Sequence, residues 1–170
     1  METKQKHNRL TKLGKDLGFT SEFYVDPVGA AGGLCLWWDD SMNVDVLLFT
    51  KNLIDTKVVM MGSGTSFHAS WIYGTPYRED KDTCWMWLTT SILSNNLPWL
   101  CIGDFNEILW AFEKQGGRAF CTTQRRHLSD FMNTNELLDL GFQGQAYTWC
   151  GKRTNGVLIR ERLDRGLINI

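Results

Sequence analysis

The sequence lacks the patterns that mark several large classes of protein. No apolar run approaches the length needed to cross a bilayer, and no signal-peptide pattern opens the chain. Low-complexity segments and internal repeats are also missing. With 170 residues, 43% of them hydrophobic and 22% charged, the chain is expected to form one globular domain over residues 1–170. We expect an intracellular protein, nuclear or cytoplasmic, without a membrane segment.

Several signatures of metal, redox and nucleotide sites are absent as well. The five cysteines are an odd number with no C-x-x-C pair, so we expect reduced, mostly buried thiols rather than disulfides or a zinc site. His7, His68 and His127 have no paired spacing for metal binding, and no Ser or Cys lies in a nucleophile elbow. The segment Gly62-Ser63-Gly64 lacks the lysine of a phosphate-binding loop.

The charge is small overall but unevenly distributed. The net charge of −1 argues against a general nucleic-acid-binding protein. However, residues 1–20 and residues 151–170 each carry five basic and two acidic groups, while the middle is acidic. A polyanion would be attracted to the two ends if the fold brings them together. Solvated termini with ordinary surface charge explain the same composition.

Hydrophobic periodicity predicts a mixed α/β domain. The segments 5–17 and 79–94 have helical spacing, the second with Trp85, Leu88 and Ile92 on one side. A further helix is expected from Thr122 or Thr123 to about Leu138, with Leu128, Phe131 and Leu138 facing inward. Short strands are predicted at 19–26, 34–38, 44–50, 57–61, 66–73, 98–102, 143–150 and 157–163.

The most informative segment is the octet 100–107, Leu-Cys-Ile-Gly-Asp-Phe-Asn-Glu. An apolar run typical of a fully buried strand ends at Gly103, and Asp104 and Asn106 follow two residues apart. In an extended chain both side chains would face the same way. A carboxylate and an amide at a strand end are suited to orient water and to hold an anionic oxygen. A simple surface turn is the alternative, but the apolar residues Ile108 and Leu109 favour a functional site.

Three further segments are weak signals when taken alone. Alternation along 159–165 places Arg160, Arg162 and Asp164 on one face, which is also the pattern of a surface ion pair. Tyr73 ends a strand, where its hydroxyl could face an anion or simply pack. Glu2 lies in an N-terminal segment that would otherwise be considered frayed.

Taken in order, these segments resemble the endonuclease/exonuclease/phosphatase superfamily, which has the DNase-I-like fold. Its blocks are matched at 2–4, 72–76, 103–106, 148–149 and 161–165. The segments Pro-Trp-Leu-Cys-Ile-Gly-Asp-Phe-Asn-Glu-Ile-Leu, Leu-Leu-Asp-Leu-Gly-Phe and Ile-Arg-Glu-Arg-Leu-Asp-Arg, together with Gly116–Arg118, are most similar to the endonuclease region of plant LINE-type (non-LTR) retrotransposon polyproteins. The resemblance implies a four-layer sandwich of two mixed β-sheets flanked by helices, with a reverse-transcriptase region in the parent polyprotein.

The resemblance also implies a reaction and its residues. It implies hydrolysis of DNA phosphodiester bonds with Mg²⁺ or Mn²⁺. Glu2 matches the metal ligand and Tyr73 the residue that supports the scissile phosphate. Asp104 would orient or deprotonate the attacking water, and Asn106 would hold a phosphate oxygen. Asp164 matches the aspartate that orients a catalytic histidine.

The chain departs from this family pattern in three places. Gly74-Thr75-Pro76 follows Tyr73 where related nucleases often have x-Pro-Asn, and neither the Asn-bearing first strand nor the final Ser-Asp-His segment is found. We therefore expect a domain incomplete at both ends, a fragment of a retroelement endonuclease that is weakly active or inactive as this chain. Two alternatives remain, a non-catalytic nucleic-acid-binding remnant and a phosphatase of the same superfamily.

Overall fold

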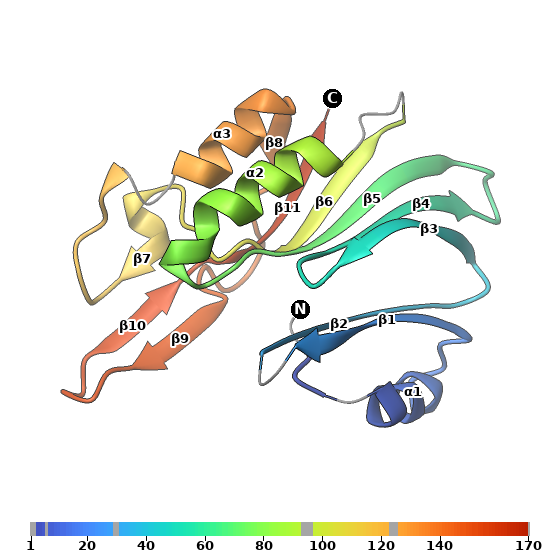
Figure 1. Cartoon of the computed structure of the whole chain (residues 1–170), viewed down its shortest axis with the longest axis horizontal. Coiled ribbons are helices and arrows are strands. Elements are labelled where there is room, and N and C mark those ends of the chain that lie inside the picture. Colours follow the sequence, from blue (N-terminus) through green and yellow to red (C-terminus); the bar gives the residue numbers. More distant parts are fainter. Residues whose placement is uncertain (1–2, 6, 29–30, 93–96, 123–125, 170) are drawn as a thin grey trace. The chain divides into compact units, whose positions relative to one another are not determined.

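A computed structural model provides the structure, which describes residues 3–5, 7–28, 31–92, 97–122 and 126–169. The chain forms two compact units (Figure 1). The first comprises Met1–Tyr73 and Ser94–Cys101, and the second comprises Gly74–Leu93 and Ile102–Ile170. Strand β6, Trp99–Asp104, begins in the first unit and ends in the second. The expectation of one domain over residues 1–170 stays a prediction.

The first unit is a helix followed by antiparallel strands. The helix ends where Gly18 takes a positive φ of 88°, a backbone conformation that glycine adopts without strain. The strands pair as the hairpin β1–β2 and as the ladder β3–β4–β5, next to which β6 begins. The helix predicted over 5–17 and the strand predicted over 66–73 are confirmed. The elements are α1 His7–Asp16, β1 Ser21–Val28, β2 Ala31–Trp38, β3 Met42–Thr50, β4 Leu53–Met60 and β5 Ser66–Tyr73.

A buried polar network lies within the first unit. Asp55 Oδ1 accepts a hydrogen bond from Ser70 Oγ at 2.5 Å and lies 2.8 Å from His68 Nε2. Ser70 Oγ in turn accepts a hydrogen bond from the indole N–H of Trp99 at 2.9 Å. All four residues are buried. Because each polar group has a partner, the network avoids the cost of unsatisfied burial, and His68 is a satisfied core histidine as expected.

The second unit places two helices beside the sheet that carries the end of β6. Within this unit β6 neighbours β11, which pairs with β8, while β7, β10 and β9 form a separate ladder. Helices α2 and α3 lie side by side (Figure 1), and the rings of Trp85 and Phe131 pack with their centroids 5.6 Å apart. The elements are α2 Lys81–Ser91 after the 3₁₀ turn η1 Arg78–Asp80, η2 Ala111–Glu113, β7 Lys114–Gln115, α3 Arg126–Thr134, β8 Leu137–Asp139, β9 Trp149–Lys152, β10 Leu158–Glu161 and β11 Asp164–Asn169.

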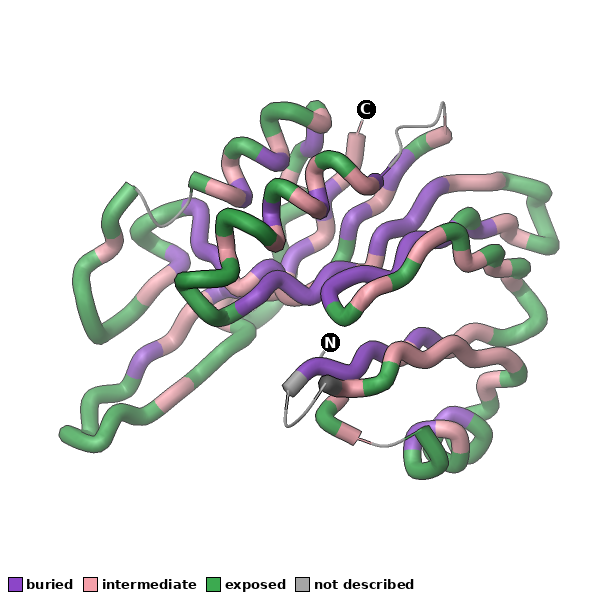
Figure 2. The backbone as a smooth tube through the Cα atoms, in the orientation of Figure 1, coloured by how far each residue is buried: buried purple, intermediate pink, exposed green. Residues whose placement is uncertain are grey.

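The aromatic ring of Trp85 also covers the residue that follows β6. Its ring stacks on that of Phe105 with the centroids 6.2 Å apart, and Phe105 is fully buried. Trp85, Leu88 and Ile92 are all buried, as the helical spacing predicts. Ile108 and Leu109 are buried too, and Figure 2 shows this burial around the end of β6. The turn after β6 is therefore held against a dry core.

Several element predictions are wrong in the second unit. Strand β6 is not fully buried, because Trp99 and Cys101 alternate with a half-buried Leu100 and an exposed Ile102. The helix predicted to reach Leu138 ends at Thr134, since Glu136 takes a positive φ of 53° and turns the chain into β8. Leu138 is consequently 51% exposed on that strand.

The C-terminal strands are shorter than predicted. Regular pairing is confined to Trp149–Lys152 in place of 143–150, and to Leu158–Glu161 in place of 157–163. The chain leaves β10 at Arg162 because this side chain is buried in an ionic network, and β11 begins two residues later.

The cysteine prediction is confirmed in part. All five cysteines are free. Only Cys101 is fully buried, however, while Cys121 and Cys150 are exposed, so the expectation of mostly buried thiols is wrong. None of the helices within the described residues is long and apolar enough to span a membrane.

Candidate functional site

Asp104 and Asn106 form a closed turn at the end of β6. The Asn106 N–H donates a hydrogen bond to Asp104 Oδ1 at 2.8 Å. Asn106 has a φ of 51°, in the left-handed region that asparagine tolerates better than most residues. The chain is therefore not extended here, so the condition under which both side chains would face the same way is not met. What brings the carboxylate and the amide together is the turn itself.

Gly74 fixes this turn from a second segment. Its N–H donates to Asp104 O at 2.7 Å, and its carbonyl accepts a hydrogen bond from Asn106 Nδ2, also at 2.7 Å. A Cβ atom at Gly74 would lie 2.2 Å from Phe105 O, so only glycine allows the two backbones to approach this closely. Gly74 thus holds the turn both at Asp104 and at Asn106.

Two further residues hold the same turn, Lys81 at the start of helix α2 and Glu107, which directly follows Asn106 in the sequence. Lys81 Nζ donates to Asn106 O at 2.6 Å and lies 3.3 Å from Glu107 Oε1. The Glu107 carboxylate is nearly inaccessible, and its second oxygen accepts the Leu128 N–H at the start of α3 at 3.0 Å. Sequence reasoning missed both residues, although Glu107 is the last residue of the informative octet.

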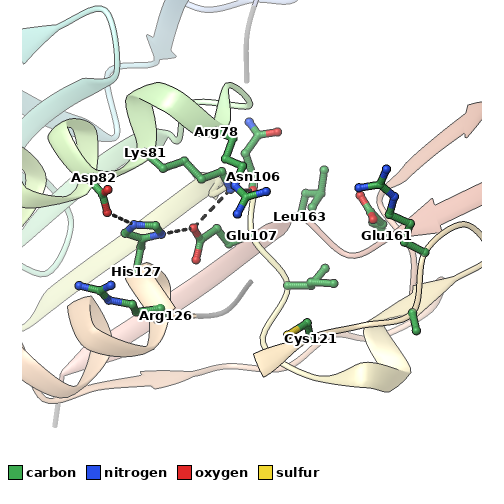
Figure 3. A pocket seen from close by; sticks show the side chains of 13 residues that line it. Arg78, Lys81, Asp82, Asn106, Glu107, Cys121, Arg126, His127, Glu161 and Leu163 are labelled. Carbon is green, nitrogen blue, oxygen red and sulfur yellow. Dashed lines mark hydrogen bonds and ion pairs between the residues drawn. The ribbon is translucent and has the colours of Figure 1, made fainter. Parts of the chain in front are cut away.

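His127 joins two carboxylates beside this turn (Figure 3). Its Nδ1 lies 2.9 Å from Glu107 Oε1, and its Nε2 lies 2.7 Å from Asp82 Oδ1. The hydrogen bond and charge of His127 lower the pKa of Asp82. The Trp85 ring stacks on the imidazole with the centroids 6.5 Å apart. His127 is thus a satisfied histidine, as expected, and it ties α2 to α3.

Asp164 begins the strand next to the end of β6. The Phe105 N–H donates to Leu163 O at 2.9 Å, so the residues after Asp104 and before Asp164 lie side by side. Thr148 Oγ1 accepts the N–H groups of Leu163 and Asp164, both at 3.0 Å. Within the described residues, no histidine forms a hydrogen bond or ion pair with the Asp164 carboxylate.

The two other predicted site residues have different outcomes. Tyr73 lies in the first unit, where it is buried with Leu34, Leu36 and Ile54. Its backbone carbonyl accepts a hydrogen bond from Asn52 Nδ2 at 2.6 Å. Its role at a scissile phosphate stays a prediction. Glu2 lies outside the described residues.

The arginines near Asp164 have a role that the alternation did not indicate. Arg165 Nη2 lies 2.5 Å from Glu113 Oε2, and Arg165 Nη1 lies 2.8 Å from Asp139 Oδ2. Arg162 bridges the same two carboxylates at 3.0 and 2.7 Å. Both arginines and Glu113 are buried, so this network is an internal support rather than a surface ion pair.

Comparison with known proteins gives matches among solved structures only, because no family model and no curated protein sequence matches the chain. The endonuclease domain of TRAS1, a telomere-specific non-LTR retrotransposon, matches with a TM-score of 0.63 and 12% identity, over 89% of this chain and 68% of that one. The human Nocturnin catalytic domain, with bound sulfate, also matches with a TM-score of 0.63 and 12% identity, over 98% of this chain and 66% of that one.

A third match is to TDP2 of D. rerio in complex with a single-strand DNA product, with a TM-score of 0.56 and 16% identity over 97% of this chain and 68% of that one. The chain has a DNase-I-like fold. The predicted mixed α/β architecture of sheets and flanking helices is therefore confirmed. The chain spans about two thirds of the length of these three neighbours.

Carboxylate, imidazole and thiol groups do not cluster as metal ligands at the Asp104–Asn106 turn in the described part of the chain. Among the described residues, no group of three or more His, Cys, Asp or Glu side chains converges as a metal site would require. Asp104 contributes one carboxylate and Asn106 one amide, while the expected ligand Glu2 lies outside the described residues. We therefore derive the chemistry of the turn from its own hydrogen-bonding groups.

Proposed function

We propose that this chain is part of a nuclease-type hydrolase that cleaves DNA phosphodiester bonds at the turn formed by Asp104 and Asn106. The observation that carries the proposal is this turn, which places a carboxylate beside an amide at the end of β6 and is held by Gly74 and Lys81. The DNase-I-like fold supports it. So do the neighbours, one named as an endonuclease and one bound to a single-strand DNA product.

The hydrogen bonds of the turn suggest a division of roles. The Asn106 amide has two N–H bonds, of which one is used by Gly74 O. The other is suited to donate to a phosphate oxygen, where a fixed donor stabilises the charge that develops during hydrolysis. Asp104 would orient or deprotonate the attacking water, and Tyr73 would support the scissile phosphate.

The proposal includes a divalent cation, Mg²⁺ or Mn²⁺, with Glu2 as a ligand. A hard cation supplies charge that offsets the phosphate oxygens and polarises the bond to be cleaved. We further propose that the chain comes from a LINE-type retroelement polyprotein of the plant kind, in which a reverse-transcriptase region is its partner. The TRAS1 neighbour, a retrotransposon endonuclease domain, supports this assignment.

We propose that the activity of this chain is weak. Asp164 has no histidine partner among the described residues, and the loss of a general acid or base typically lowers a rate by about 10²- to 10⁴-fold. Non-catalytic DNA binding is the second candidate function, and the cationic residues described in the next subsection favour it.

The test is nicking of supercoiled DNA with Mg²⁺ by the wild type, Asp104→Asn and Asn106→Gly. Glycine at 106 keeps the left-handed backbone while removing the amide and its hydrogen bond to Gly74 O, so an unchanged melting temperature of this variant is required before loss of activity is assigned to the side chain. Asp45→Asn, which removes an exposed carboxylate from β3, is the matched control. We expect slow nicking that both site variants abolish and that the control retains. Equal nicking by all four proteins would contradict the proposal.

A further inference from the structure

The second unit contains a cavity of about 600 Å³ that reaches the Asn106 turn (Figure 3). Its volume lies within the range of small-ligand pockets, roughly 300–1,000 Å³. Arg78, Lys81 and Asn106 gather at one side of it, and Glu161 lies on another. Arg118 and Arg126 complete the set of cationic side chains around it.

The acidic side chains around this cavity already have partners. Glu107 is bound by Lys81 and His127, at 3.3 and 2.9 Å. Asp82 lies 2.7 Å from the other nitrogen of His127. Glu161 is bound by the ammonium group of Lys114. Each of the three carboxylates thus has at least one hydrogen-bond or ion-pair partner among the described residues.

The arginines, in contrast, have little compensation. Within the described residues, the guanidinium groups of Arg78 and Arg118 form no hydrogen bond or ion pair. Arg126 has only a long contact of 3.8 Å with Asp130, and both side chains are mostly exposed, so this pair contributes little. Arg78 and Arg118 therefore border the cavity without an anionic partner, and Arg126 borders it with only a weak one, so all three exposed guanidinium groups can bind an anion there.

We propose that this cavity binds backbone phosphate of the DNA strand whose cleavage at Asn106 was proposed above, and the inference rests on that proposed function. Guanidinium groups bind phosphate oxygens in a bidentate manner, so two or three of them fix one phosphate strongly. Lys81 remains bound to Asn106 O and Glu107 and links the cavity wall to the turn. A strand seated on Arg78 and Arg118 would present its next phosphate to Asn106.

The test measures binding of a short single-stranded DNA oligonucleotide in the Asp104→Asn background without metal, so that no cleavage interferes. Arg78→Gln/Arg118→Gln is compared with Lys152→Gln/Arg153→Gln, which removes the same two charges from the end of β9 and the loop that follows, outside the cavity. We expect Arg78→Gln/Arg118→Gln to weaken binding at least tenfold. The slope of log Kobs against log salt should fall by about 0.7 per lost phosphate contact. The control should change affinity less than twofold.

Two further arms make the result decisive. Arg78→Lys/Arg118→Lys keeps the charge but removes the bidentate geometry, and it should bind with intermediate affinity. Inorganic phosphate should raise the melting temperature less than the oligonucleotide does at equal phosphate concentration. Unchanged affinity in Arg78→Gln/Arg118→Gln, or phosphate as the better ligand, would overturn the proposal.

The cavity and the proposed hydrolysis can fail separately. If nicking depends on Asp104 but Arg78→Gln/Arg118→Gln keeps the wild-type KM, phosphate binding in the cavity is refuted and the proposed hydrolysis is not. Arginine-dependent binding with no Asp104-dependent nicking would refute the hydrolysis and leave the cavity standing as a nucleic-acid site.

Discussion

At the scale of single residues, the candidate site depends on one unusual backbone conformation. Asn106 lies in the left-handed region, and its N–H, amide and carbonyl all have partners in the second unit. Strain of this kind persists where surrounding contacts over-determine it, and it is enriched at functional sites. Gly74 supplies the partner of the amide, donates a second hydrogen bond to Asp104 O, and has no space for a side chain.

We predict that Gly74→Ala disrupts the turn. The added methyl would collide with Phe105 O, so the two backbones must separate at a cost of about 1–3 kcal/mol, the typical range for overpacking. Urea unfolding should show this loss of stability, and any nicking activity should fall with it. Gly62→Ala is the control, because nothing lies within 4 Å of a Cβ atom there. Equal stability of the two variants would show that the close approach is not needed.

The pattern of the sequence predicted Asp104 and Asn106 as a pair but not the way in which they meet. Period-2 alternation applies to an extended strand. Strand β6 ends at Asp104, and Asn106 is no longer in an extended conformation. Lys81 was not identified because its contact to Asn106 joins positions that are distant in sequence. Contacts of this kind depend on the packing of α2 beside β6, which local periodicity does not contain.

At the scale of elements, an ionic network joins the second unit. Glu113 from η2 and Asp139 from β8 are bridged by Arg162 and Arg165, which flank the start of β11. Burial alone would raise the pKa of Glu113, but the hydrogen bonds and charge of Arg165, with two backbone N–H groups, lower it overall. Burial alone would also raise the pKa of Asp139, but the hydrogen bonds of Arg162 and Arg165 help to lower it overall.

We predict that this network makes the stability of the chain depend on pH in the acid range. Because both folded pKa values lie below the ordinary carboxyl range of about 4, the stabilisation is fully present above that range. This stabilisation is lost as the pH falls toward and through the lowered pKa values that Glu113 and Asp139 have in the folded chain. Urea unfolding between neutral pH and about pH 3 should therefore show stability falling with decreasing pH.

Glu113→Gln tests the assignment of this pH dependence. The variant leaves two buried arginines with one carboxylate, so we expect a loss of about 3–5 kcal/mol at neutral pH and a weaker dependence on acid. Asp45→Asn on β3 should change neither quantity. An unchanged acid slope in Glu113→Gln would show that other carboxyl groups control it.

Elements with regular apolar spacing were predictable from the sequence, whereas those whose ends depend on the ionic network were not. Helix α2 and strands β5 and β6 were located closely, because their apolar spacing is regular. Strands β8 and β11 were not separated from their neighbours, since their ends are set by Glu136 and by the buried Arg162. Burial of an arginine depends on partners from distant segments, and the sequence alone favoured an exposed side chain.

At the scale of the whole molecule, the fold was predictable because short blocks occur in a fixed order along the chain. The two compact units and the cationic cavity were not predicted, since both arise from contacts between distant segments. The uneven charge along the sequence pointed to the termini, yet Arg78, Arg118 and Arg126 lie in the acidic middle. Net charge over a segment therefore did not locate the arginines that we propose to bind phosphate.

The most direct test of the account is the rate at which the chain nicks supercoiled DNA with Mg²⁺, in the presence and absence of imidazole. Imidazole can replace a missing proton-transfer group, so we predict slow nicking by the wild type that imidazole accelerates and that Asp104→Asn abolishes under both conditions. Equal rates for the two proteins, or no nicking by either with imidazole present, would contradict a catalytic role for Asp104.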